Sequence, residues 1–187
     1  MITDIINRIK VDMTGIFREV NDWFDIPGDL MHYTPESGGW TVRQILEHIS
    51  LTNYFLLILI RKGVDSSLKK SKTTDYTNRL HGYDLDWKKL KMIGTHKSFG
   101  WQSPDHMEPA GDMSLSEIRS KIQMQYDQCM LYLDQLDKGQ GILHTTMMTV
   151  NNLGKIDVYH YIYFLAQHAK RHIAQMKQIM GEFVFAN

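Results

Sequence analysis

The chain contains four long stretches in which apolar residues recur every three to four positions. This period places apolar side chains on one face of an α-helix, and no stretch with the strict alternation of a β-strand competes with it. We therefore predict an all-α protein, a four-helix bundle whose helices pack through these apolar faces. The four predicted helices cover, approximately, residues 2–24, 41–61, 114–136 and 157–180.

Residues at the ends of these stretches support the same four helices. Threonine followed by glutamine at 41–44, and serine followed by glutamate at 114–117, each have the form of a capping box. Pro27–Gly28 ends the first helix, and a polar loop whose last breaker is Gly154 leads into the fourth. Gly181 stands where a left-handed C-terminal cap of the fourth helix is expected.

Residues 62–113 form a long polar connection that is rich in glycine and proline, with at most a short helix near 85–93. A connection of this length usually crosses the end of a bundle or has a function of its own, and here it could join parallel second and third helices. Phe99 and Trp101 indicate that it packs onto the bundle. The lysines of 69–72 are interpreted as part of a solvated loop.

Composition indicates one folded domain over residues 1–187. The chain is 43% hydrophobic and 22% charged, which is typical of a globular protein of this length with its own core. Basic and acidic residues balance at 21 each, so no net field attracts the chain to phosphate backbones, and nucleic acid is not expected as a partner.

Cysteine content and hydropathy indicate a cytoplasmic protein without a membrane partner. Cys129 is the only cysteine, so no intrachain disulfide can form, and its apolar neighbours predict a small buried hydrophobe instead of a reactive thiol. The N-terminus lacks the pattern of a signal peptide. The apolar run at 54–60 is much shorter than a bilayer crossing requires.

Two histidines of the fourth predicted helix, His168 and His172, are four residues apart and so lie one turn apart on one face. With nine histidines in the chain, chance alone would give roughly 0.4 pairs at this spacing, so the pair by itself is weak evidence. Tyr161, Phe164 and Leu165 lie on the same face, which indicates that the pair points into the core. Two inward imidazoles at this spacing can chelate one metal ion.

His48 is the candidate for a third ligand, because it lies on the buried stripe of the second predicted helix. His160 is eight residues from His168, about 12 Å along the helix, which is too far to share an ion. Three histidine ligands would leave coordination positions free, as in catalytic sites. Core histidines that only form hydrogen bonds remain the alternative. The other histidines fall in predicted loops: His32, His81, His96, His106 and His144.

No catalytic group beyond the metal is predicted. Three polar residues of the crossover could approach the site and act as a general base: Asp105, His106 and Glu108. Polar loop residues are usually exposed, so a role in solvent is the more favoured interpretation of each. Tyr54 and Tyr161 are candidate hydrogen-bond donors to the ligands. Lys170 and Arg171 are expected to face solvent, and Glu47 to lie on a different face of its helix from His48.

Three segments of the chain together form a recognisable pattern. Residues 40–48, from Trp40-Thr41 to His48, fit the motif W-S/T-x-x-x-x-x-x-H. Residues 168–175, H-A-K-R-H-I-A-Q, fit the motif H-x-x-x-H-x-x-Q, and between the two motifs lies the aromatic and proline-bearing segment 99–109, followed by a serine-capped helix. In these motifs and their order the chain resembles the DinB-like branch of the DinB/YfiT-like superfamily of metal-dependent enzymes, and the likeness covers nearly the whole chain.

This resemblance implies a fold, a metal and two reaction classes. The bundle would run up-down-down-up, with the long crossover between helices two and three, and would form a homodimer. His48, His168 and His172 would bind one divalent ion, for which imidazole suits zinc, nickel or iron, and equally copper. The ion would activate a water, as in a hydrolase, or a low-molecular-weight thiol cosubstrate, as in a thiol-dependent transferase or isomerase acting on a small molecule. The alternative is a non-enzymatic stress-response or structural protein with a structural or vestigial metal site.

Overall fold

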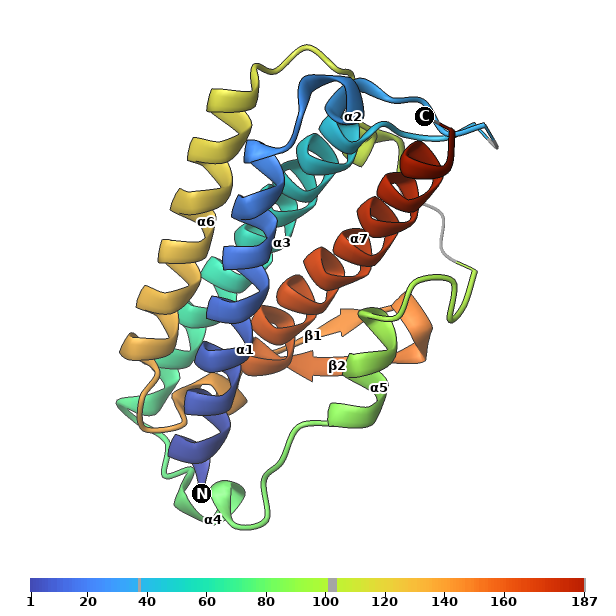
Figure 1. Cartoon of the computed structure of the whole chain (residues 1–187). Helices are drawn as coiled ribbons and strands as arrows, with labels where there is room; N and C mark the ends of the chain where they lie inside the picture. Colours follow the sequence, from blue (N-terminus) through green and yellow to red (C-terminus); the bar gives the residue numbers. More distant parts are fainter. Residues whose placement is uncertain (37, 101–103, 187) are drawn as a thin grey trace.

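The computed structural model describes residues 1–36, 38–100 and 104–186, and it is mostly helical, which confirms the predicted helical fold class. In this part of the chain, four long helices lie side by side, with α1 packed on α6 and α7 and with α3 packed on α6 and α7 (Figure 1). In Figure 1, α1 and α7 run in one direction, and α3 and α6 run in the opposite direction. The four helices are α1 (Ile2–Asp22), α3 (Val42–Ser71), α6 (Leu115–Gln135) and α7 (Val158–Ala186).

Shorter elements connect the four long helices. The helical pieces are α2 (Gly28–His32), α4 (Thr77–Leu80) and α5 (Trp87–Ile93). Short 3₁₀ turns cover Trp23–Asp25, Asp105–Met107, Gln140–Leu143 and Val150–Asn152. Two strands, β1 (Thr145–Met148) and β2 (Gly154–Asp157), complete the described chain.

Both predicted capping boxes are present. At the start of α3, the Thr41 hydroxyl accepts from the Gln44 backbone N–H (3.3 Å), and the Gln44 side-chain oxygen accepts from the Thr41 N–H (3.0 Å). Ser114 and Glu117 make the same reciprocal pair at the start of α6. These bonds satisfy backbone donors that the first turn of a helix leaves without partners, which is why both helices begin where the sequence predicts.

The loop predicted before the last helix is in part a β-hairpin, so the expectation of a purely helical chain is corrected there. β1 and β2 pair antiparallel, with Thr145 opposite Asp157 and Met148 opposite Gly154. The connecting turn places Asn151 and Asn152 at φ 49° and 51°, a left-handed conformation that asparagine tolerates better than most residues. Strands of four residues are too short to produce a readable alternation, which is why the sequence pattern did not reveal them.

Helix α3 extends to Ser71, ten residues beyond its predicted end at Arg61. The sequence interpretation placed Gly63 in the long connection 62–113, but Gly63 lies inside α3 and is buried. A Cβ placed on Gly63 would lie 2.8 Å from Cγ2 of Val158 and 3.3 Å from the His144 ring. Gly63 therefore allows α3 to approach the start of α7 closely, and it does not end the helix.

The lysine cluster predicted as a solvated loop belongs to the last turn of α3. Lys69 and Lys70 lie inside the helix, and the Lys70 ammonium donates to the Leu143 carbonyl (3.0 Å). Positive charge at this position is favourable because the C-terminal end of a helix carries partial negative charge.

The predicted C-terminal cap at Gly181 is wrong, because α7 continues through this residue to Ala186. Contacts beyond the glycine hold the final turns in place. Phe183 packs edge-on against Tyr33 at 5.4 Å, and Glu182 accepts hydrogen bonds from the Tyr33 hydroxyl (3.0 Å) and the Glu36 backbone N–H (2.6 Å).

The crossover between α3 and α6 is packed onto the bundle. Its helix α5 coincides with the short helix predicted at 85–93, and Leu90 and Ile93 are fully buried where α5 lies on α7. Phe99 is half-buried against the core, as predicted, while Trp101 lies outside the described residues.

The core encloses Cys129, and burial raises the pKa of its thiol to about 12. A thiol in this environment stays protonated and behaves as a small hydrophobe, as the sequence predicted. Within the described residues, none of the helices combines the length and the apolarity that crossing a membrane requires.

Candidate metal centre

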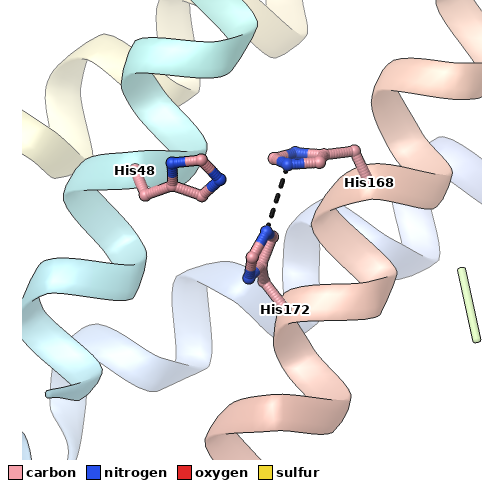
Figure 2. Close-up of side chains that lie close together, drawn as sticks. All are labelled: His48, His168 and His172. Carbon is pink, nitrogen blue, oxygen red and sulfur yellow. Dashed lines mark hydrogen bonds between the residues drawn. The ribbon is translucent and has the colours of Figure 1, made fainter. Parts of the chain in front are cut away.

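Three histidines from two helices converge in the interior. Figure 2 shows His48 on α3 and His168 and His172 on α7 pointing toward one another. Each ring contributes one nitrogen to a group of three nitrogens that lie within 4.8 Å of one another. All three side chains are buried. The ring centroids are 4.5 to 5.1 Å apart. The structure thus brings together the three residues that the sequence selected.

The second nitrogen of two rings is held by an acceptor. Nδ1 of His48 lies 2.7 Å from the Met107 carbonyl oxygen, and Nδ1 of His172 lies 2.9 Å from the side-chain oxygen of Gln175. Because these oxygens accept, Nδ1 carries the proton in both rings, and the lone pair is on Nε2. Gln175 belongs to the closing sequence motif. The backbone carbonyl of Met107 has no signature in sequence and was not predicted.

The geometry fits a divalent ion. Nε2 of His168 lies 3.1 Å from Nε2 of His172. Two nitrogen ligands at 2.0–2.1 Å from one ion are about 2.9 Å apart at an octahedral angle and about 3.3 Å apart at a tetrahedral angle. The observed separation falls between these values, so the pair is spaced for one shared ion.

Burial keeps the three rings neutral. The pKa of His168 lies well below its usual value, first because of burial and then because of His172 and His48. Burial, followed by the neighbouring His48, lowers the pKa of His172 to about 3. Burial also lowers the pKa of His48, against the opposing effect of its bond to Met107. Neutral imidazole is the form that ligates metals.

Comparison with known proteins identifies the family. The model of the DinB superfamily matches residues 18–176, a span that contains all three histidines. The chain belongs to the DinB superfamily. The uncharacterized protein YuaE of Bacillus subtilis (strain 168) is 22% identical over 175 residues, covering 88% of this chain and 95% of YuaE. No solved structure is a significant match.

An indole covers one side of the DinB histidine cluster. Trp40, which opens the family-like motif, has its ring centroid 4.6 Å from that of His48 and 6.4 Å from that of His172. An aromatic face at this distance restricts the motion of both imidazoles and excludes water from one side of the cluster.

Two charged residues of α3 hold the crossover against the DinB site. The Arg43 guanidinium donates to the carbonyls of Gly111 and Met113, each at 2.6 Å. Glu47 lies on a different face from His48, as expected, where it is buried and accepts from the Gly111 N–H (2.9 Å). These bonds fix the segment whose Met107 carbonyl orients His48.

Arg171 is buried, so the prediction that it faces solvent is wrong, while Lys170 is exposed as expected. The guanidinium donates to the carbonyls of Thr95 (2.7 Å) and Phe99 (3.3 Å) and lies 4.9 Å from the Phe99 ring centroid. The crossover covers this face of α7, which helical periodicity alone could not reveal. Arginine suits the position because its several donors can satisfy carbonyls in a connection without ladder partners.

The remaining sequence candidates do not join the cluster. Tyr54 is 57% exposed, so its prediction as a donor to the ligands is wrong. Tyr161 donates to the Met147 carbonyl (3.1 Å) and so binds β1 instead of a ligand. Nδ1 of His160 forms a hydrogen bond with the Asp157 carboxylate oxygen Oδ1 at 2.8 Å. The three polar crossover residues are exposed, as the sequence favoured: Asp105, His106 and Glu108.

Cavities lie on both sides of the DinB cluster. One, of about 470 Å³, lies toward the hairpin and is bounded by α3, α7, the crossover and the segment 147–151. The other, of about 220 Å³, lies beside Trp40 and Gln175 and contains the charged residues Lys97 and Glu182. The cavities therefore adjoin residues that contact the imidazoles, Met107 on one side and Trp40 and Gln175 on the other, while the imidazoles themselves line neither cavity.

Proposed function

We propose that this DinB-superfamily chain binds one divalent metal ion through His48, His168 and His172 and is a metal-dependent enzyme acting on a small molecule. The observation that carries this proposal is the convergence of three neutral imidazoles, two of them with Nδ1 occupied by an oxygen acceptor. Three protein ligands leave coordination positions free for a water or a substrate. When bound, the ion supplies Lewis-acid chemistry, lowering the pKa of a coordinated water or thiol.

The reaction class is a hydrolysis or a transfer that uses a low-molecular-weight thiol, and the ion is zinc, nickel or iron. The chain's own contribution is to orient the rings through Met107 and Gln175 and to exclude water through Trp40. We further propose that residues 1–187 form one domain, a four-helix bundle of up-down-down-up topology. In this topology, the crossover would join the parallel helices α3 and α6 of the bundle.

Elemental analysis of the purified protein, with titration of the metal-free chain by Zn²⁺ and Co²⁺, tests the proposal. We expect about one ion per chain. His48→Ala, His168→Ala and His172→Ala should each weaken metal binding at least about 100-fold, because each removes one of the three ligands. His81→Ala, on an exposed loop, is the matched control. A wild-type chain that binds no ion, or cluster variants that bind like His81→Ala, would refute the proposal.

A structural metal site is the second candidate, and the near-complete burial of all three imidazoles favours it. A structural ion should raise the midpoint of thermal unfolding strongly, and removal by chelator should destabilise the fold. A catalytic ion with open positions should have a smaller effect on unfolding and should bind added thiols or anions. Thermal unfolding with and without chelator, together with the visible spectrum of the Co²⁺ form during thiol titration, separates the two.

A further inference from the structure

The larger cavity begins one helical turn from the histidine cluster on both helices. Thr52 follows His48 by four residues on α3, and Phe164 precedes His168 by four residues on α7, and both line the cavity. Because α3 and α7 run in opposite directions (Figure 1), these two steps lead toward the same end of the molecule. Each step is about 6 Å along its helix. The cavity therefore lies on the hairpin side of the cluster, one helical turn from it, although none of the three histidines lines it.

Met107 connects the cluster to the cavity. Its carbonyl oxygen accepts from Nδ1 of His48 at 2.7 Å, while its sulfur lies 3.8 Å from the Thr52 hydroxyl at the cavity wall. One residue thus orients a candidate ligand and forms part of the wall. A molecule that fills this end of the cavity contacts the residue that supports His48.

The wall of this cavity is mostly apolar. None of the described residues that line it carries a charge. Its polar side chains belong to Thr52, Thr149, Asn151 and Tyr161. The Tyr161 hydroxyl donates to the Met147 carbonyl, the Thr52 hydroxyl faces the Met107 sulfur, and Thr149 and Asn151 lie together at the hairpin turn. The apolar lining is supplied mainly by Leu56, Leu59, Phe99, Met147, Met148 and Phe164.

This chemistry selects a class of ligand. A cavity of about 470 Å³ is of the size that binds small organic molecules. An ionised group placed in it would lose hydration without gaining a partner of opposite charge, which is costly. Methionine side chains on the wall are flexible and polarisable, and they adapt to hydrocarbon or aromatic shapes.

We infer that this cavity, here named the apolar subsite, binds an uncharged aliphatic or aromatic group of the substrate whose reacting end lies at the three histidines. The inference rests on the proposed function, and it adds the substrate class. The smaller cavity on the other side of the cluster, with Lys97 and Glu182, is suited to polar groups and does not compete for this ligand.

Straight-chain alkyl hydroxamates test the apolar subsite, because the head group ligates a metal and the tail length can be varied. The full chain loaded with Co²⁺ is titrated with acetohydroxamate through octanohydroxamate, and binding is measured from the visible spectrum of the ion. We expect affinity to rise about fourfold with each methylene until the cavity is filled. Affinity that is independent of tail length would overturn the inference.

Two neighbouring residues of α3 provide a matched pair of variants. Leu59 lines the cavity and is 39% exposed, whereas Ile58 is 43% exposed and does not line it. Leu59→Asp should abolish the dependence on tail length and leave acetohydroxamate binding unchanged. Ile58→Asp should behave like the wild type. Equal behaviour of the two variants would contradict the inference.

The neutral dye N-phenyl-1-naphthylamine separates failure of the subsite from failure of the proposed function. Its fluorescence with the metal-free chain should be lost in Leu59→Asp and retained in Ile58→Asp, whether or not Co²⁺ binds. A chain that binds the dye in this pattern but binds no Co²⁺ keeps the subsite and loses the metal site. A chain that binds Co²⁺ but shows neither the dye pattern nor the tail-length effect loses the subsite alone.

Discussion

At the scale of single residues, the candidate site depends on what holds the second nitrogen of each imidazole. Spacing on α7 and the apolar stripe of α3 made His48, His168 and His172 the candidates among nine histidines, and the family-like motifs favoured a shared metal over core histidines that only form hydrogen bonds. The acceptors could be predicted only in part. Gln175 belongs to a sequence motif, whereas the Met107 carbonyl is backbone and could be found only from the folded crossover.

Removing the acceptor of His172 should weaken metal binding. Gln175→Leu leaves Nδ1 of His172 without its oxygen partner, so the ring loses its fixed orientation, and affinity for Zn²⁺ should fall roughly 10- to 100-fold. Gln175→Glu keeps an acceptor and should retain binding. Gln178→Leu, on the exposed face of α7 within the same cavity wall, is the control. Competition titration with a chelating dye measures all three, and unchanged affinity in Gln175→Leu would rule out the orienting role.

The buried histidines should make the metal-free protein sensitive to acid. The folded-state pKa of His172, about 3, is below the unfolded value of about 6.5, so between these values the unfolded chain binds the proton that the folded chain refuses. The contribution of His172 to the free energy of unfolding should therefore be fully present above pH 6.5. Below pH 6.5 it should fall by about 1.4 kcal/mol per pH unit. His48 and His168, whose pKa values are also lowered, act in the same direction.

Urea unfolding of the metal-free chain at pH 7, 6 and 5 measures this dependence. His172→Gln removes one titrating group, and its stability should fall less steeply with acid than that of the wild type. His81→Ala, which is exposed, should keep the wild-type slope. The explanation fails if His172→Gln shows the same slope as the wild type.

At the scale of elements, local signals determined where helices begin, and tertiary contacts determined where they end. Both capping boxes predicted the starts of α3 and α6 correctly. The predicted ends of α3 at residue 61 and of α7 at Gly181 were wrong, because the helices continue where they pack against residues far away in sequence, Val158 beside Gly63 and Tyr33 beside Phe183. The hairpin could not be predicted for the same reason. Its two strands stabilise each other, and each is too short to show a strand pattern in the sequence.

Two helical glycines should respond in opposite directions to alanine. Gly63→Ala would place a methyl group 2.8 Å from the Val158 side chain, and we expect a loss of about 1–3 kcal/mol in the free energy of unfolding. Gly15 on α1 is exposed, and no atom lies within 4 Å of the position that a Cβ would take there, so Gly15→Ala should stabilise by about 0.5–1 kcal/mol. Chemical denaturation compares the two, and stabilisation by Gly63→Ala would contradict the close approach.

At the scale of the whole molecule, we propose a homodimer that uses the face formed by α3 and α6. Tyr54 and Met124 are 57% and 60% exposed, and with Leu57 and Met113 they form the apolar part of a cavity between these helices, whose polar part includes Lys121 and Gln125. Exposed apolar area of this kind is typical of association surfaces. A symmetric pair would cover it with the same surface of a second copy.

Light scattering coupled to size-exclusion chromatography should give twice the chain mass of 21.9 kDa at micromolar concentration. Met124→Lys should shift the protein to the monomer, because it places a charge in the centre of the contact. Val11→Lys, at a 70% exposed position on α1, should remain a dimer. A wild-type monomer at these concentrations would reject the proposal.

The division of the three histidines between two helices has a consequence for folding. Two candidate donors lie one turn apart on α7, so this helix alone presents a chelating pair before it packs against α3. An ion captured by this pair would favour the helical form of the segment and lower the cost of helix nucleation. Such an ion would also bind the unfolded chain to some degree, so we expect the increase in thermal stability on metal addition to be smaller than the affinity of the complete site implies.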